Sequence, residues 1–157
     1  MRERRALLCV LMLSGALLAA PGGDSAPTVD ALLAGERVRI PLAGLAERVP
    51  LAADQDFRVV EVGRDASTSH HLVAIRTAEV PHRHDRHDLL VVIARGHGTM
   101  LISNTTLPVG ERSILYVPRG TVHAFTNRSD APAVAYVVYT PPFDGTDRVQ
   151  GEAEDSP

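Results

Sequence analysis

The sequence contains no lysine and no tryptophan, and it has a single cysteine, Cys9. Its 16 basic residues are therefore all arginine. The absence of lysine excludes Schiff-base catalysis by lysine and the lysine-dependent phosphate binding of P-loop proteins. The net charge is −3 and the sequence lacks the basic footprint of nucleic-acid-binding domains, so we expect no nucleic-acid partner.

Long apolar runs are also absent, except at the N-terminus, where the chain has the form of a secretory signal peptide. The basic stretch MRERR precedes the uncharged run ALLCVLMLSGALLAA, and Pro21 and two glycines follow it. A run of this length is too short to span a bilayer comfortably, because a span takes about 20 residues. We therefore expect residues 1–23 to be removed on export, leaving a periplasmic or secreted protein without a stable membrane anchor.

Removal of residues 1–23 would also take away Cys9, the only thiol. The mature chain would then hold no disulfide, no catalytic thiolate and no cysteine-ligated metal. Three arginines and one glutamate leave with the same segment, so the remaining charge is 13 − 18 = −5. The mature protein is predicted to be mildly acidic.

The 157 residues suffice for one domain with a hydrophobic core. Residues 24–56 form a leader of mixed composition ahead of that domain. In this leader, TVDALLAGERVR predicts a short helix with Thr28 or Asp30 as its N-cap. The rest of the leader is broken by Pro41, Gly44 and Pro50. We expect the leader to be partly helical and to pack on the main domain.

From residue 57 onward, short β-branched runs alternate with turn signals. Strands are predicted at residues 57–63, 70–80, 88–94, 98–102, 114–117, 123–127 and 133–139. Many short strands at near-regular spacing are typical of an antiparallel sandwich or barrel, and no window favours a long helix. We predict an all-β domain over residues 57–145, followed by a flexible acidic tail at residues 146–157.

Two of the predicted strands, DLLVVIA and AVAYVVY, are apolar on both faces. Such strands are buried on both sides, or they face the core on one side and another subunit on the other. A small monomeric barrel would carry polar residues on its outer face. The pattern therefore favours a homodimer.

The stretch PHRHDRHD, residues 81–88, carries the most informative side chains. His82 and His84 are two residues apart, so on a strand both side chains point to one face, roughly 7 Å apart. Two imidazoles so placed can converge on one metal ion. A third ligand must come from another strand, and His123, after the tight turn PRGTV, is the candidate. By themselves, two histidines at this spacing fit a hydrophilic loop equally well.

Two stretches resemble the paired motifs of the cupin superfamily. HRHDRHDLLVVIARG, from His82 to Gly96, is similar to the first motif, which has two histidines separated by a single residue, an acidic residue and a closing glycine. GERSILYVPRGTVHAFTN, from Gly110 to Asn127, is similar to the second motif. The P-x-G-x-x-H-x-x-x-N core of that motif is complete, with its histidine at His123.

The resemblance covers residues 57–145 and implies a cupin-type double-stranded β-helix, the RmlC-like jelly-roll barrel. It also implies a single-domain (monocupin) protein with one divalent metal near the middle of the barrel. His82, His84 and His123 match the histidines that bind the metal in the motifs. Small proteins of this superfamily commonly pair as homodimers.

The sequence departs from the motif at the fourth metal ligand, which is normally a glutamate. Counted forward from His84, the matching residue is Asp88; counted back from Gly96, it is Leu89. On a straight strand Asp88 would face the metal. A bulge after His84 would instead turn Leu89 inward and bring His87 to that face. Three readings stay open: three histidines alone, three histidines with Asp88, or four histidines including His87.

Imidazole ligands, with or without a carboxylate, suit Fe, Mn, Zn, Ni or Cu, so we expect one divalent transition metal as cofactor. Its open positions would allow the protein to act on a small molecule as an oxygenase or an isomerase. Acid–base candidates near the histidines are Asp88 and Glu79. The alternative is a non-catalytic module that binds a small ligand or a metal. The sequence leaves open whether the protein is an enzyme.

Overall fold

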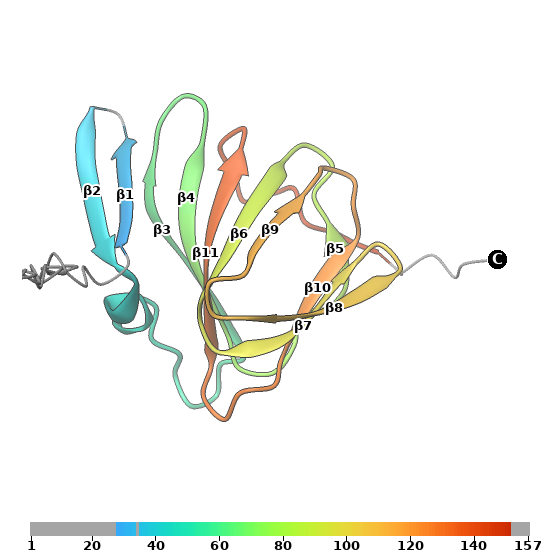
Figure 1. The fold of residues 1–157 in the computed structure, drawn as a ribbon. Helices are drawn as coiled ribbons and strands as arrows, with labels where there is room; N and C mark the ends of the chain where they lie inside the picture. Colours follow the sequence, from blue (N-terminus) through green and yellow to red (C-terminus); the bar gives the residue numbers. More distant parts are fainter. Residues whose placement is uncertain (1–27, 34, 152–157) are drawn as a thin grey trace, which may run out of the picture.

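The computed structural model describes residues 28–33 and 35–151, and its fold is drawn in Figure 1. The predicted signal peptide, residues 1–23, lies outside the described residues, so its cleavage and the export of the chain stay predictions. Within the described ranges, no helix has the length and apolar character needed to cross a membrane.

Two five-stranded antiparallel sheets form the body of the molecule (Figure 1). The first, which we call the leader-side sheet, has the strand order β3-β4-β11-β6-β9. The second, which we call the histidine sheet, has the order β12-β5-β10-β7-β8. The chain passes back and forth between the two sheets, as in a jelly roll. The structure confirms the all-β, jelly-roll prediction.

The strands agree closely with the predicted ones. The leader-side sheet contains β3 (Phe57–Arg64), β4 (Ser69–Ile75), β6 (Asp88–Arg95), β9 (Ile114–Val117) and β11 (Ala133–Thr140). The histidine sheet contains β5 (His82–Arg83), β7 (His97–Ile102), β8 (Thr105–Gly110), β10 (His123–Asn127) and β12 (Val149–Gln150). The sequence did not predict β8, whose proline is tolerated because this strand lies at the edge of its sheet. It also missed β5 and β12 as strands, because each is only two residues long.

The main core lies between the two sheets. Alternate residues of the leader-side strands point into it, since side chains on a strand alternate between faces. Those inward residues include Val73 and Ile75 on β4, Leu89 and Val91 on β6, and Val137 and Tyr139 on β11. Met100 and Phe125 meet them from the histidine sheet. Burial of these apolar side chains supplies the main driving force for closing the barrel.

The leader does not form the predicted helix. It forms a β-hairpin of β1 (Thr28–Leu33) and β2 (Glu36–Pro41), followed by two short 3-10 turns, η1 (Leu42–Gly44) and η2 (Ala46–Arg48). Gly35, in the connecting turn, has a φ of +84°. Glycine adopts this conformation without strain, and it is incompatible with a continuous right-handed helix. The helix prediction was wrong because it counted this glycine as a helix position.

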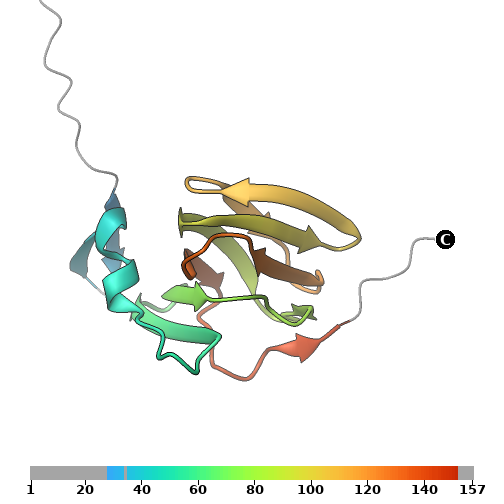
Figure 2. The ribbon, with the colours of Figure 1, turned by 90° about the horizontal axis from the view of Figure 1, so that it is seen from below.

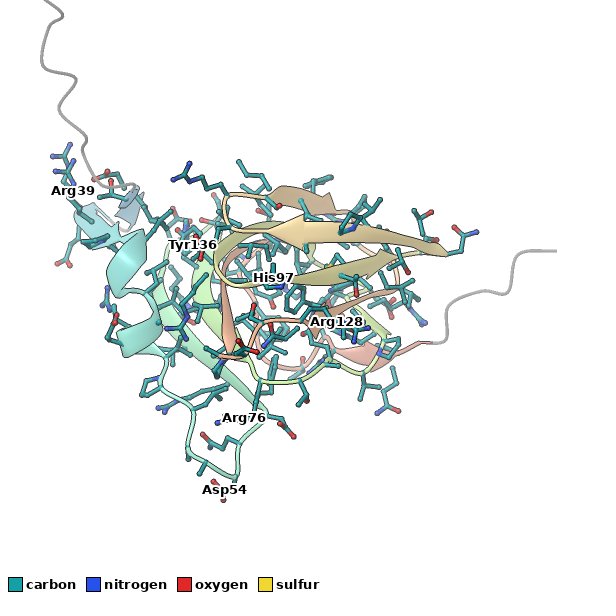
Figure 3. All side chains as sticks on the ribbon, turned by 60° about the horizontal axis from the view of Figure 1, so that its bottom comes forward. Arg39, Asp54, Arg76, His97, Arg128 and Tyr136 are labelled. Atoms are coloured by element: carbon teal, nitrogen blue, oxygen red, sulfur yellow. The ribbon has the colours of Figure 1, made fainter. Side chains whose placement is uncertain are left out.

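The leader packs against the outer face of the leader-side sheet. Ile40, Leu45 and Val49 are at most 1% exposed. They form a second core with four outward-facing residues of the sheet, Leu72, Ala74, Val134 and Tyr136. Figure 2 shows the leader beside one side of the barrel, and Figure 3 shows Tyr136 next to it.

This second core explains why two strands are apolar on both faces. On β11, Val137 points into the barrel and Val134 points to the leader. The chain therefore covers part of its own outer face, and a second subunit is not needed to account for the pattern. The homodimer stays a prediction, with its argument from sequence weakened.

The barrel also extends further along the chain than predicted. Residues 146–151, which we expected to begin a flexible tail, include β12, and β12 pairs with β5. Asp147 is only 3% exposed. The acidic composition was misleading because the carboxylate of Asp147 accepts hydrogen bonds from the main-chain N–H groups of Asp85 and Arg86. Residues 152–157 lie outside the described residues.

Candidate metal centre

Three histidines come together on the inner side of the histidine sheet. His82 on β5 is the direct cross-strand partner of His123 on β10, so the two side chains share one face. Their ring centroids are 4.4 Å apart. His84, just after β5, lies 5.2 Å from His82 and 5.6 Å from His123 by the same measure. One ring nitrogen from each lies within 4.8 Å of the others, and all three residues are buried.

Hydrogen bonds orient two of the rings. Nδ1 of His82 lies 2.9 Å from the carbonyl oxygen of Val80, and Nδ1 of His123 lies 2.9 Å from that of Thr121. A carbonyl oxygen accepts only, so each Nδ1 carries the proton and donates it. Each Nε2 then keeps a free lone pair, the arrangement that second-shell carbonyls impose on metal-binding histidines. His84 differs, because its buried Nδ1 has no hydrogen-bond partner among the described residues.

The three imidazoles are held in the neutral form that metal binding requires. Burial, together with the neighbouring His123, lowers the pKa of His82 to about 3 and that of His84 to about 4. Burial also lowers the pKa of His123 itself. Neutral rings need not lose a proton before they bind a metal. This buried set of three nitrogen donors fits a divalent transition metal.

The structure does not bring Asp88 into this cluster. Its carboxylate accepts hydrogen bonds from the main-chain N–H of Arg119 at 2.9 Å and from the Arg119 guanidinium at 2.7 Å. The Arg119 side chain lowers the pKa of Asp88 to about 2. Asp88 is therefore an ionised partner of Arg119, and the reading that made it a metal ligand is not supported.

Leu89 takes the inward position instead. It is 4% exposed and lines the cavity beside the histidines. Residues 84–87 are not part of a strand and connect β5 to β6. This connection shifts the inward–outward alternation of side chains by one residue. Counting back from Gly96 thus gave the inward residue, and counting forward from His84 did not.

His87 forms a separate cluster with His84 and Asp147. One potential ligand atom from each of the three lies within 4.8 Å of the others. Nδ1 of His87 lies 2.5 Å from Oδ2 of Asp147, and its Nε2 lies 3.2 Å from the carbonyl oxygen of Pro142. His87 therefore lies beside His84 and Asp147 and is not part of the cluster of His82, His84 and His123. The sequence gave no sign of Asp147, because this residue was assigned to the tail.

The three histidines open into a cavity of about 230 Å³ between the sheets. Most of its wall is apolar, with contributions from Val73, Ile75, Leu89, Val91, Met100 and Phe143. The polar groups are the histidines, Glu79, Tyr139 and Arg148. The cavity therefore suits a small molecule with an apolar body and one polar end.

Glu79 and Arg148 lie beside the histidines. Oε2 of Glu79 accepts a hydrogen bond from the main-chain N–H of Phe125, and burial raises the pKa of Glu79. Nη2 of Arg148 lies 3.7 Å from Oε1 of Glu79 and 3.2 Å from Nδ1 of His82. The guanidinium also lies over the ring of Phe57, 5.1 Å from its centroid. Glu79 was predicted from the sequence as an acid–base candidate, whereas Arg148 was not, because it falls in the predicted tail.

Comparisons with known proteins agree with this fold. Residues 69–139 match the cupin domain family. An uncharacterized protein of Aquifex aeolicus is 31% identical over 98 residues, which span 62% of this chain and 80% of that protein.

Solved structures share the barrel at low identity. TT1209 of Thermus thermophilus has a TM-score of 0.55 and 19% identity over 62% of this chain and 94% of its own. KdgF of Halomonas sp. has a TM-score of 0.55 and 14% identity over 60% and 86%. The nucleoside dehydratase PAC13 of Streptomyces has a TM-score of 0.54 and 16% identity over 69% and 89%. With its two histidine motifs on adjacent strands of a jelly-roll barrel, the chain belongs to the cupin superfamily.

Proposed function

We propose that the chain is an exported, metal-dependent cupin enzyme that acts on a small molecule. In this proposal His82, His84 and His123 hold one divalent transition metal, Fe, Mn, Zn, Ni or Cu. The observation that carries the proposal is the convergence of three buried, neutral imidazoles on an apolar cavity of about 230 Å³. Three protein ligands leave positions open for a substrate or water.

A metal bound there would polarise a substrate oxygen or lower the pKa of a bound water. The protein supplies the remaining functions. The apolar walls exclude water and hold the body of the substrate. Glu79, whose carboxyl group lies at the polar end of the cavity, holds or moves a proton. Because Phe125 fixes one Glu79 oxygen, the other is the atom available for proton transfer.

Among the reactions open to such a site, Glu79 favours an isomerase type of proton transfer over an oxygenase. An isomerase that moves a hydrogen within its substrate needs a group that takes up and returns a proton, and Glu79 is placed to do so. PAC13, a fold neighbour at 16% identity, is a nucleoside dehydratase, so this barrel accommodates enzymes that act on small molecules. The alternative is a non-catalytic binding module, which the mostly apolar wall of the cavity favours.

Metal analysis of the untagged mature chain tests the site. We expect close to one equivalent of metal by inductively coupled plasma mass spectrometry, and loss of most of it in His82→Ala and in His123→Ala. His97→Ala is the matched control, because His97 is exposed and starts β7 at the end remote from His123. Equal metal content in the parent, His82→Ala and His123→Ala would overturn the proposal.

Activity screening then separates the reaction classes. The metal-loaded protein is incubated in D2O with a panel of small hydroxy and oxo compounds and followed by NMR. An isomerase incorporates solvent deuterium into its substrate, and Glu79→Gln should abolish this incorporation while keeping the metal. Uptake of dioxygen by the iron-loaded protein would instead indicate an oxygenase. Absence of both reactions would favour the binding module.

A further inference from the structure

The candidate metal centre lacks a negatively charged ligand. Its three nitrogen donors are neutral, and Leu89 stands at the inward position where a carboxylate was expected. A divalent cation held by neutral imidazoles keeps its full charge of about +2 in an apolar cavity, where charge is costly. The site as built therefore favours an anion from outside the chain.

A second positive group lies beside the histidines. Nη2 of Arg148 is 3.2 Å from Nδ1 of His82, and the proton on that nitrogen is already given to Val80. Nδ1 of His82 therefore has no lone pair with which to accept a hydrogen bond from Arg148. The described residues provide no other hydrogen-bond acceptor for this guanidinium, whose five N–H donors match a carboxylate well.

Glu79 does not neutralise Arg148 fully. The closest approach between the two side chains is 3.7 Å, which is longer than a hydrogen bond. Glu79 uses its other oxygen to accept the N–H of Phe125. It is also the only acidic residue among the described residues that line the cavity, so with a metal bound the positive charges exceed the negative.

Arg148 also lines a second hollow that adjoins the cavity. This hollow of about 310 Å³ shares Phe57, Glu79, His82 and Arg148 with the first. The Arg148 side chain is 37% exposed, so it meets both solvent and the interior. A ligand in either hollow can therefore lie beside the guanidinium.

We propose that the ligand of this site is a small carboxylate with an apolar body, and that Arg148 binds its carboxylate group. This deepens the proposed function and rests on it, since the same cavity and the same metal are involved. One guanidinium beside one metal suits a singly charged, two-oxygen group, and the apolar walls suit the rest of the molecule.

The test uses the zinc-loaded mature protein and titration calorimetry with two carboxylates, isovalerate and benzoate. Their amides, isovaleramide and benzamide, have nearly the same shape without the charge. We expect the carboxylates to bind at least about ten-fold more tightly than the amides. Arg148→Gln should remove this preference with zinc content unchanged, and Arg148→Lys should retain part of it.

Arg128→Gln is the matched control, because Arg128 is exposed and follows the far end of β10 from His123. It should bind all four compounds as the parent does. Equal binding of carboxylates and amides by the parent, or an unchanged preference in Arg148→Gln, would overturn the proposal. So would tighter binding of inorganic phosphate than of either carboxylate.

Metal content separates this proposal from the proposed function. A parent protein that binds none of Fe, Mn, Zn, Ni and Cu overturns the metal-dependent enzyme, and the carboxylate titrations are then made on the metal-free chain. In that case a preference for carboxylates that is lost in Arg148→Gln still supports the anion site. Equal binding of benzoate and benzamide by the metal-free chain overturns it.

Discussion

Oδ2 of Asp147 lies 2.5 Å from Nδ1 of His87, and both residues are almost fully buried. Asp147 also accepts the main-chain N–H groups of Asp85 and Arg86. This one carboxylate therefore ties the segment before β12 to the turn that begins at His84. The position of a candidate metal ligand thus depends on a residue more than 60 positions further along the chain.

Asp147→Asn should destabilise the protein and weaken its metal binding. The substitution should cost about 3 kcal/mol, because the buried hydrogen-bond partners of Asp147 lose a charged acceptor. The turn at His84 would loosen as well. Urea unfolding and metal analysis measure the two effects. Asp144→Asn is the control, because Asp144 lies in the same segment with an exposed side chain that pairs with Arg86, and it should change stability by less than about 1 kcal/mol.

The carboxylate of Asp147 should also make the free energy of unfolding depend on pH in the acid range. Burial acts to raise the pKa of Asp147, but the hydrogen bonds from Arg86 and His87 outweigh it and lower the pKa from 3.8 to about 2. A lowered pKa in the folded state stabilises the fold above pH 3.8, and this contribution disappears as the pH falls through about 2. It amounts to about 2 kcal/mol. The difference in unfolding free energy between the parent and Asp147→Asn should therefore shrink over this window, and a constant difference would contradict the assignment.

Asp88→Asn should leave the metal content unchanged. The carboxylate pairs with Arg119, whose side chain is 54% exposed, so the substitution should cost no more than about 1 kcal/mol of stability. Leu89→Ala should instead lower the free energy of unfolding by about 3 kcal/mol, because Leu89 is buried in the core. Metal analysis and urea unfolding of the two variants test which of these neighbours faces the cavity. Loss of metal in Asp88→Asn would restore the reading with a fourth ligand.

Leu45→Ala should show how far the leader stabilises the barrel. Leu45 is fully buried in the second core, so we expect a loss of about 3 kcal/mol. Leu107→Ala, at a leucine that is 41% exposed on edge strand β8, should change stability by less than about 1 kcal/mol. A cooperative urea transition that is equally shifted in both variants would mean that the leader contributes nothing specific.

The sequence predicted the short strands because these depend on local periodicity, whereas the barrel and the set of three histidines followed from the resemblance to the two cupin motifs. The order of the two motifs predicted that His82, His84 and His123 converge, and the structure adds that His82 and His123 are direct partners on adjacent strands. The partners of Asp88 and His87 could not be predicted from the sequence. A turn at residues 84–87 reverses which side chains of the following strand point inward, compared with a straight strand. The roles of Asp147 and Arg148 depend on contacts across the whole barrel, and their acidic surroundings in the sequence resemble those of a solvated tail.

The pairing of β12 with β5 has a consequence for the order of assembly. Residues 149–150 follow every other strand of the barrel in the chain, yet they border the strand that carries His82. Since a polypeptide emerges from its N-terminus, the sheet that holds the histidines is completed only by the last barrel strand to be made. A nascent chain stalled before Asp147 would have both histidine motifs and still lack the two side chains, Asp147 and Arg148, that contact the histidine segment from β12's side of the sheet.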